Sequence, residues 1–225
     1  MADRIIQTET LQSIANALRG GASQSVSDKI EVADFALKIA YLRNEYDGVI
    51  SGYSTIVNIP YGCDKIGKWR LAYLANLLTV NIPDTVITID EHALENTGMT
   101  TLTIPSTVQT IGVQALGNNP NLVELIIEEG IQTIPNYFAY ACNKLPLVDI
   151  PESCNSIGVM AFRECSKLAT INIKNSNMTS IGTQAFSGIK SDAVINCGFS
   201  QGAVSGAPWG APSTVTINYD VDFSD

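Results

Sequence analysis

The stretch from Leu145 to Leu168, LPLVDIPESCNSIGVMAFRECSKL, contains the complete unit of a repeat that runs through most of the chain. Its Ile-Pro pair, or a close relative, returns at Ile59-Pro60, Ile82-Pro83, Ile104-Pro105, Ile127-Glu128, Ile150-Pro151 and Ile173-Lys174. Successive isoleucines of this set are 22 or 23 residues apart. A constant step of this size is typical of a solenoid, in which each coil stacks on the preceding one.

Four apolar columns follow from the repeat and form the predicted core. In the quoted unit their members are Val148, Ile150, Cys154 and Ile157. The alternation of Val148 and Ile150 with polar or exposed neighbours is typical of a β-strand. The proline after this strand has no amide to donate, so we expect it to end the strand ladder and turn the chain.

Each coil also contains a compact turn, which reads Ala161-Phe162 in the quoted unit and is followed by an anchor such as Leu168. We interpret it as one helical or 3₁₀ turn per coil. The fourth coil reads Phe138-Ala139 instead, so its turn is expected to shift by one residue. The sequence therefore predicts an α+β repeat fold of about six coils, with short strands and one helical turn in each.

The unit resembles the BspA-like leucine-rich repeats, whose coil reads roughly L-x-x-[LVI]-x-I-P-x-x-V-x-x-I-G-x-x-A-F-x-x-C-x-x-L. Leu145 to Leu168 matches this pattern almost position by position, including Cys142 and Cys165 ahead of their leucines. The resemblance extends from about Val57 to Ile189 and implies a leucine-rich-repeat solenoid. Members of this family occur on bacterial surfaces, in protist proteins and in phage genomes.

Composition and charge exclude several classes of partner. The 225 residues are 45% hydrophobic, which is ample for a repeat body with small caps. A net charge of −9 disfavours nucleic acid and anionic membranes, because both require basic surfaces. No segment reaches the ~20 apolar residues of a membrane span, and the first residues lack the apolar stretch of a signal peptide. We expect no nucleic-acid partner, no membrane span and no Sec export.

Catalytic, metal and cofactor chemistry is not indicated either. The one histidine, His92, is expected to be a solvated corner residue. Glu128 and Glu129 are adjacent, so they should diverge rather than form a glycosidase pair. No P-loop, dinucleotide fingerprint or Gly-x-Ser-x-Gly motif is present. Cys63 and Cys154 lie in an apolar column and are expected to be free core thiols. The sequence thus predicts no enzyme, no cofactor and no metal site.

Residues 1–47 are predicted to form a module of two amphipathic helices, the first ended by Gly20-Gly21. The candidate docking residues are Leu11, Ile14, Leu18, Phe35 and Ile39. A hairpin this small is not stable alone, so its apolar faces should dock on the first coil or on a partner. A plain cap for the solenoid is the alternative.

Residues 48–190 form the predicted solenoid, and residues 191–225 form a C-terminal cap with a final strand. The N-terminal module looks like that of tail-associated proteins in phages and prophages of gut Firmicutes. The segment Ser205 to Pro212 is similar to the closing segment of phage-borne BspA-like proteins. The two ends together imply a phage or prophage virion protein, although capping alone would also account for Trp209.

The outward side chains of the first strand of each coil form the candidate binding face. They are Thr79, Asn81, Thr101, Thr103, Glu124, Ile126, Leu147, Asp149, Thr170 and Asn172. Hydroxyls and amides of this kind can hydrogen-bond a glycan or a polar protein surface, but they are also ordinary on a solvated sheet. Ile126 and Leu147 are apolar exceptions, which favours a binding hot spot or a subunit contact there.

The sequence therefore predicts a non-enzymatic virion structural protein, associated with the tail. The helical end would attach to other virion proteins, and the solenoid would bind a host-surface protein, a glycan or a partner protein. A homo-oligomer is expected, because virion appendages are usually symmetric. Two alternatives stay open: a BspA-like adhesin on the bacterial cell surface, and a purely architectural decoration protein of the virion.

Overall fold

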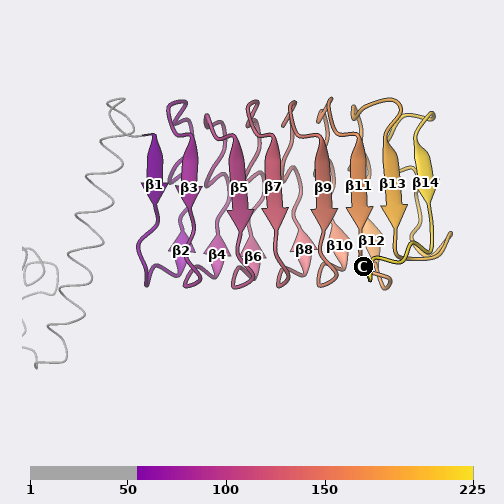
Figure 1. The fold of residues 1–225 in the computed structure, drawn as a ribbon, viewed down its shortest axis with the longest axis horizontal. Helices are drawn as coiled ribbons and strands as arrows, with labels where there is room; N and C mark the ends of the chain where they lie inside the picture. Colours follow the sequence, from indigo (N-terminus) through magenta and orange to yellow (C-terminus); the bar gives the residue numbers. More distant parts are fainter. Residues whose placement is uncertain (1–54, 225) are drawn as a thin grey trace, which may run out of the picture.

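The computed structural model describes residues 55–224, which wind into a parallel β-solenoid of about seven turns (Figure 1). Each of the first six coils contributes one long and one short strand, and the last two turns contribute a long strand only. The long strands are β1 (Ile56–Asn58), β3 (Thr79–Asn81), β5 (Thr101–Ile104), β7 (Glu124–Ile127), β9 (Leu147–Ile150), β11 (Thr170–Ile173), β13 (Val194–Cys197) and β14 (Thr216–Asn218). The short strands are β2 (Lys65–Ile66), β4 (Thr88–Ile89), β6 (Thr110–Ile111), β8 (Thr133–Ile134), β10 (Ser156–Ile157) and β12 (Ser180–Ile181).

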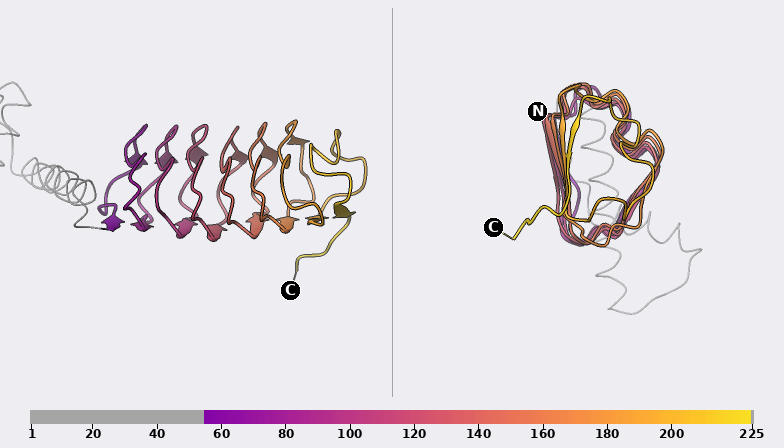
Figure 2. Two further views of the ribbon diagram at one scale, coloured as in Figure 1. Left: turned by 90° about the horizontal axis from the view of Figure 1, so that it is seen from above. Right: turned by 90° about the vertical axis from the view of Figure 1, so that its right-hand side faces the viewer.

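Long and short strands lie on different sides of the coil, and the turns between them complete its outline (Figure 2). Strands pair in register, so that Ile171 of β11 lies opposite Val148 of β9 and Ile195 of β13. This register stacks equivalent side chains of all coils into continuous columns. The predicted apolar columns are buried; in the fifth coil Val148, Ile150 and Cys154 are fully buried. The leucine-rich-repeat solenoid is therefore present.

The prediction of an α+β fold with one helical turn per coil is wrong, because residues 55–224 contain strands and turns but no helix. Two residues of each turn adopt a left-handed backbone, as His92 (φ 56°) and Asn96 (φ 53°) do in the second coil. That conformation interrupts helical hydrogen bonding. The turn amides instead bond the neighbouring coil, and the Leu94 amide donates to the Ala115 carbonyl at 2.9 Å. The turns thus form a third hydrogen-bonded side of the solenoid.

The turn of the fourth coil does not shift, contrary to expectation. Its left-handed residues, Tyr137 and Ala141, are four positions apart, like His92 and Asn96. Phe138 simply occupies the position that other coils give to alanine, and it is fully buried. Its ring packs edge-on against Phe162 of the next coil, with centroids 5.8 Å apart. The inter-coil hydrogen bonds therefore determine the register more strongly than the order of the two side chains.

The C-terminal segment continues the solenoid before ending it. β13 pairs in register with β11, and β14 pairs in parallel with β13. Trp209 is buried and packs against Phe186 and Phe199, with ring centroids 6.3 and 6.1 Å away. An aromatic cluster thus closes the last turn on the side opposite the long strands.

The five cysteines are free thiols, and all but Cys63 are buried. Burial raises the pKa of Cys142 and of Cys197 to about 12. Cys165 donates its thiol hydrogen to the Ala139 carbonyl at 3.1 Å. These thiols fill core space and satisfy turn carbonyls, a structural role.

Candidate functional site

The outward side of the long strands, here called the long-strand face, carries all of the predicted binding residues. Six of them are exposed: Asn81, Thr101, Thr103, Glu124, Ile126 and Leu147. The other four, Thr79, Asp149, Thr170 and Asn172, are half-buried. Their side chains alternate with buried core residues along each strand, for example in the pattern of β7. The structure therefore places all ten residues on the outward side of the long strands, while their use in binding stays a prediction.

The strand ladder of this face is interrupted twice, between β3 and β5 and between β7 and β9. Proline explains the second interruption. In neighbouring coils the amides of Val123 and Glu128 donate to the preceding coil at 2.8 and 3.0 Å. The equivalent residues that flank β9 are Pro146 and Pro151, which have no amide hydrogen. β9 therefore cannot begin or end a ladder with β7.

The first interruption coincides with a long hydrogen bond, because the Thr100 amide reaches the Leu78 carbonyl only at 3.4 Å. Pro105 after β5 does not explain it alone, since Pro83 follows β3 in the same way and β3 still pairs with β1. A hollow of about 210 Å³ lies at this interruption. This N-terminal hollow is lined by Thr79–Ile82 and Thr101–Thr103. Its outward side chains are hydroxyls and an amide, so it is polar and uncharged.

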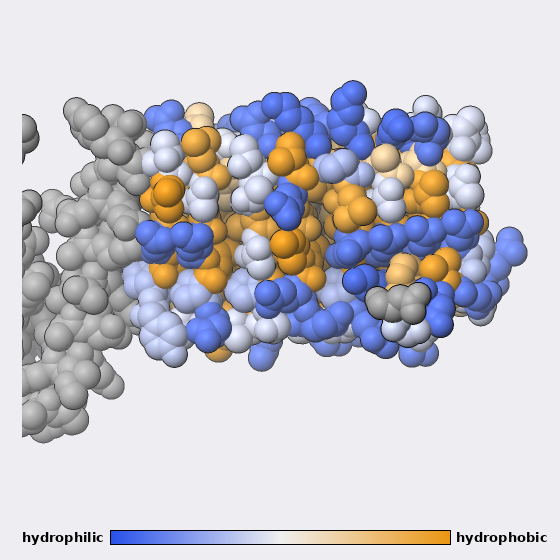
Figure 3. Space-filling view, viewed as in Figure 1, coloured by the Kyte–Doolittle hydropathy of each residue, from blue (hydrophilic) through white to orange (hydrophobic). Residues whose placement is uncertain are grey.

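A second hollow, of about 270 Å³, lies between β7 and β9. This central hollow is lined by Val123–Ile127, Leu147, Asp149 and Lys174. Val123 and Ile126 are each 46% exposed and Leu147 is 42% exposed, so apolar side chains surround it. Figure 3 shows apolar surface reaching the solvent near the middle of the long-strand face. The two hollows therefore both lie at interruptions of the ladder but differ in chemistry.

Charged groups border the central hollow unevenly. Asp149 accepts a hydrogen bond from Asn172 Nδ2 at 2.8 Å and lies 3.7 Å from Lys174 Nζ. Within residues 55–224 the Glu124 carboxylate has no such partner. Partial burial alone would raise the pKa of Glu129. Hydrogen bonds from the Ser153 and Glu152 amides and the nearby charge of Lys174 outweigh it, so that the pKa is lowered. The one cation of the hollow is thus shared between carboxylates.

A chain of amide side chains crosses the C-terminal half of the long-strand face. Asn218 donates to Asn196 Oδ1, Asn196 to Asn172 Oδ1 and Asn172 to Asp149 Oδ1, each at 2.8 Å. Asn172 and Asn196 thus use both their donor and their acceptor on neighbouring coils, which fixes the orientation of these two amides. This chain of hydrogen bonds ends at Asp149, beside the central hollow, because the equivalent position in the preceding coil is Ile126.

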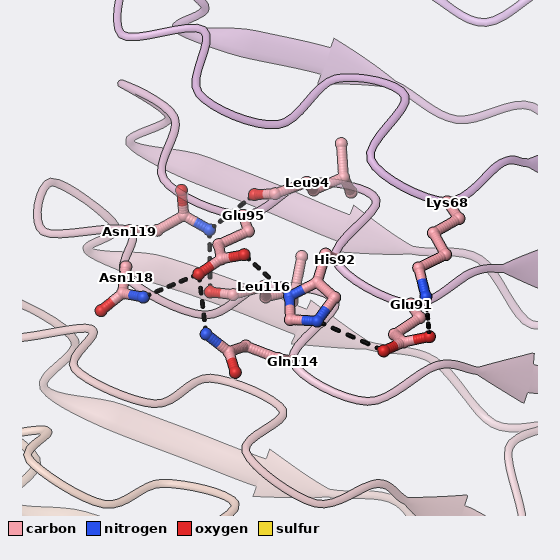
Figure 4. Close-up of polar contacts among 9 residues, drawn as sticks. All are labelled: Lys68, Glu91, His92, Leu94, Glu95, Gln114, Leu116, Asn118 and Asn119. Carbon is pink, nitrogen blue, oxygen red and sulfur yellow. Dashed lines mark hydrogen bonds and ion pairs between the residues drawn. The ribbon is translucent and has the colours of Figure 1, made fainter.

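His92 is not the solvated corner residue that the sequence suggested. Its ring is half-buried and stacks on Trp69, with centroids 3.8 Å apart. Nδ1 lies 2.8 Å from Glu95, a buried carboxylate that also accepts from Gln114 Nε2 at 2.7 Å and Asn118 Nδ2 at 2.8 Å (Figure 4). His92 lies on the same coil as Glu95, and Gln114 and Asn118 lie on the next coil. The network therefore cross-links coils, which is a structural role.

The remaining predictions concern metal ligands, membrane spans and the docking residues. No group of three His, Cys, Asp or Glu residues that could hold a metal ion occurs within residues 55–224. In the same range no helix has the length and apolar character of a membrane span. The predicted docking residues Leu11, Ile14, Leu18, Phe35 and Ile39 lie outside the described residues. Their docking role stays a prediction.

Comparison with known proteins identifies the repeat. Residues 64–192 match the BspA type leucine rich repeat region in 6 copies. The chain belongs to this family. Repeats of this kind typically serve as non-enzymatic binding scaffolds, and the matched region spans both hollows. No curated protein matches the sequence.

Several solved structures are similar in part. A leucine rich cell surface protein of Faecalibacterium prausnitzii is 20% identical, with a TM-score of 0.32; the match covers 79% of this chain and 63% of that one. The T. pallidum leucine rich repeat protein is 18% identical, with a TM-score of 0.48 and 73% of both chains covered. The pneumococcal vaccine antigen PcpA is 16% identical, with a TM-score of 0.44, and 74% and 51% of the chains are covered. The chain thus spans less than two thirds of the F. prausnitzii protein.

Sequence reasoning found Ile126 and Leu147 but missed the hollow around them. Val123 was overlooked because it precedes the strand, and Lys174 because it follows another strand. The signal was nevertheless readable, since Pro146 and Pro151 flank one strand only. Two such prolines predict a broken ladder once the register of the coils is known.

Proposed function

We propose that this protein is a non-enzymatic binding protein that contacts a protein partner through its long-strand face, centred on the central hollow. The supporting observation is the exposed apolar group of Val123, Ile126 and Leu147, which lies together around one hollow near the middle of the face. Protein interfaces have this anatomy, with an apolar centre inside a polar rim. Exposed apolar side chains that cluster on a protein surface often mark an interaction site.

The size of the hollow favours a macromolecule over a small ligand. Pockets for small molecules enclose roughly 300 to 1,000 Å³ and bury most of the ligand. The central hollow, at about 270 Å³, lies below this range and opens onto the face. It can seat a side chain of a larger partner, while the surrounding face supplies the remaining contact area.

The finer proposal is that the protein is a tail-associated component of a phage or prophage virion. Its support is the resemblance of both chain ends to phage-borne proteins. In this setting residues 1–47 attach to other virion proteins, and the solenoid faces a host-surface protein or glycan. Homo-oligomeric assembly is part of the same proposal. Stoichiometric recovery of the chain in purified particles supports it, and its absence from particles refutes it.

Membership of the BspA type family is also compatible with a bacterial surface adhesin. Recovery in cell-wall fractions, without particles, favours this alternative. Recovery in particles together with no host binding at all favours a decoration protein.

The role of the face is tested with the full chain and fractionated envelope material of candidate hosts. Replacing Ile126 and Leu147 by Asp should abolish binding to a target that the native chain retains. The matched control changes Thr101 and Thr103 to Arg, which alters the N-terminal hollow instead. Loss with the Asp pair alone places the contact at the centre. Retained binding in both variants refutes the long-strand face as the site, and protease-resistant binding to glycan refutes a protein partner.

A further inference from the structure

The central hollow combines apolar walls with acceptors for a positive charge. Ile126 of β7 and Leu147 of β9 both line it, on either side of the interruption of the ladder, and occupy diagonal rather than opposite positions in the register of the coils. At its rim, the Glu124 carboxylate is exposed and has no side-chain partner within residues 55–224. Electrostatic attraction to Glu124 is therefore available to a ligand and is not used by the solenoid itself.

A backbone acceptor lies on the same rim. In the coils on either side, the carbonyls of Thr100 and Pro146 each accept two amides from the following coil. The Val123 carbonyl has the equivalent position, but Pro146 cannot donate to it, and no described residue does so in its place. An unpaired carbonyl oxygen carries partial negative charge and readily accepts from an ammonium or guanidinium group.

The other charges nearby do not cancel this preference. Lys174 lies across the hollow, but it is 3.7 Å from Asp149 and also interacts with Glu129. The whole chain carries a net charge of −9, so its general field also favours a cation. A partner with an acidic residue at the Glu124 rim would meet repulsion.

We propose that the central hollow binds an apolar side chain of a protein partner that has a lysine or arginine beside it. The apolar side chain inserts between Ile126 and Leu147, and the cation bonds the Glu124 carboxylate and the Val123 carbonyl. This inference rests on the proposed function, because it names the chemistry of the partner at the same site. It requires no covalent step and no cofactor.

The probe is a library of random peptides displayed singly and selected on the full chain. Peptides that bind the native chain should be enriched in a Leu, Ile, Met or aromatic residue next to Lys or Arg. Ile126→Ser should weaken such peptides by about tenfold or more, because the apolar contact is lost. Glu124→Gln should weaken them a few-fold and flatten the dependence on salt, because a screened ion pair is lost.

Two variants are matched controls. Ile87 is 45% exposed, close to the 46% of Ile126, but lies on the side of the short strands, so Ile87→Ser should leave binding unchanged. Asp84→Asn removes an exposed carboxylate in another coil and should also have no effect. Unchanged melting temperatures of all four variants exclude unfolding as the cause of a loss.

The outcomes separate this inference from the proposed function. Selected peptides that depend on Ile126 but lack a basic residue, or that bind Glu124→Gln equally well, overturn the inference and leave the proposed function standing. Failure to enrich any peptide that depends on Ile126 also overturns the inference. If the Asp pair at Ile126 and Leu147 in addition keeps its binding to envelope material, the proposed function fails too.

Discussion

The N-terminal and central hollows arise from the same backbone event and differ in what surrounds it. At both, a long strand fails to pair with the preceding long strand. The N-terminal hollow is lined outwardly by Thr79, Asn81, Thr101 and Thr103, whereas Val123, Ile126 and Leu147 surround the central one. In a regular repeat, a break in strand pairing can therefore create a hollow, and the few outward side chains beside the break determine whether the hollow is polar or apolar.

The largest expected effect concerns the core residue beneath each hollow. Leu102 lies under the N-terminal hollow and Leu125 under the central one, and both are buried. Either change to Ala should lower the free energy of unfolding by about 2 to 5 kcal/mol, because it removes buried apolar contacts and leaves a cavity. Chemical denaturation of both variants measures the two losses. A loss below about 1 kcal/mol for Leu125→Ala alone would mean that the central hollow admits water to the core.

A smaller effect is expected along the amide ladder that ends at the central hollow. Asn172→Ala removes two side-chain hydrogen bonds, to Asp149 and from Asn196. Asn81→Ala removes one, to Asn58, beside the N-terminal hollow. We expect the free energy of unfolding to fall by about 1 kcal/mol for Asn172→Ala and by about half that for Asn81→Ala, because these bonds are partly exposed to water. Thermal unfolding gives the comparison, and equal losses would contradict a ladder whose members each contribute.

The interruption itself can be tested at Pro146. Pro146→Ala supplies the missing amide opposite the Val123 carbonyl, and one hydrogen bond contributes about 0.5 to 1.5 kcal/mol. A more flexible unfolded chain offsets about 0.4 to 1 kcal/mol of this gain, so overall stability should change little. Hydrogen exchange at the Leu147 amide should nevertheless become slower as the ladder closes, and the new amide at position 146 should be protected. Pro120→Ala, in an exposed turn, is the control for the unfolded-state effect. Fast exchange in Pro146→Ala would show that proline is not the cause of the break.

Most of the fold could be predicted from the sequence, because the apolar residues that form the core recur at a constant spacing. The columns through Val148, Ile150, Cys154 and Ile157 identify the solenoid and its inward side directly from sequence. The turns were misjudged as helical, because Ala161-Phe162 has the composition of a helical turn. Their amides bond the next coil, and such tertiary hydrogen bonds leave no local signal.

The candidate site was readable only in part for a related reason. Ile126 and Leu147 stand out as apolar residues at outward positions, and outwardness follows from strand alternation. The hollow depends on a missing bond between coils, which requires the register of β7 and β9. Lys174 could be assigned to it only after Asp149 and Ile150 of the preceding coil were placed beside β11.

The smallest expected effect concerns Glu129, which interacts with Lys174 of the central hollow, whereas no charged residue lines the N-terminal hollow. Glu129 Oε1 and Oε2 accept hydrogen bonds from the Glu152 and Ser153 amides at 2.9 and 2.8 Å, and the pKa of Glu129 lies below its ordinary value of 4.5. A carboxylate with a lowered folded pKa stabilises above that ordinary value, and its contribution disappears as the pH falls through the folded pKa. Glu129→Gln should therefore cost less than about 1 kcal/mol at neutral pH, because the group is exposed.

The pH dependence of this cost is the decisive measurement. Denaturation curves of the native chain and Glu129→Gln should differ at neutral pH and converge below pH 4.5, as the native carboxyl becomes protonated. Glu152→Gln changes a neighbouring carboxylate while keeping the backbone donor to Glu129, so it should not show the same convergence. A difference that persists undiminished into acid would mean that the Glu129 side chain acts through packing. In that case the charge of Glu129 would not compete with Asp149 for Lys174 at the central hollow.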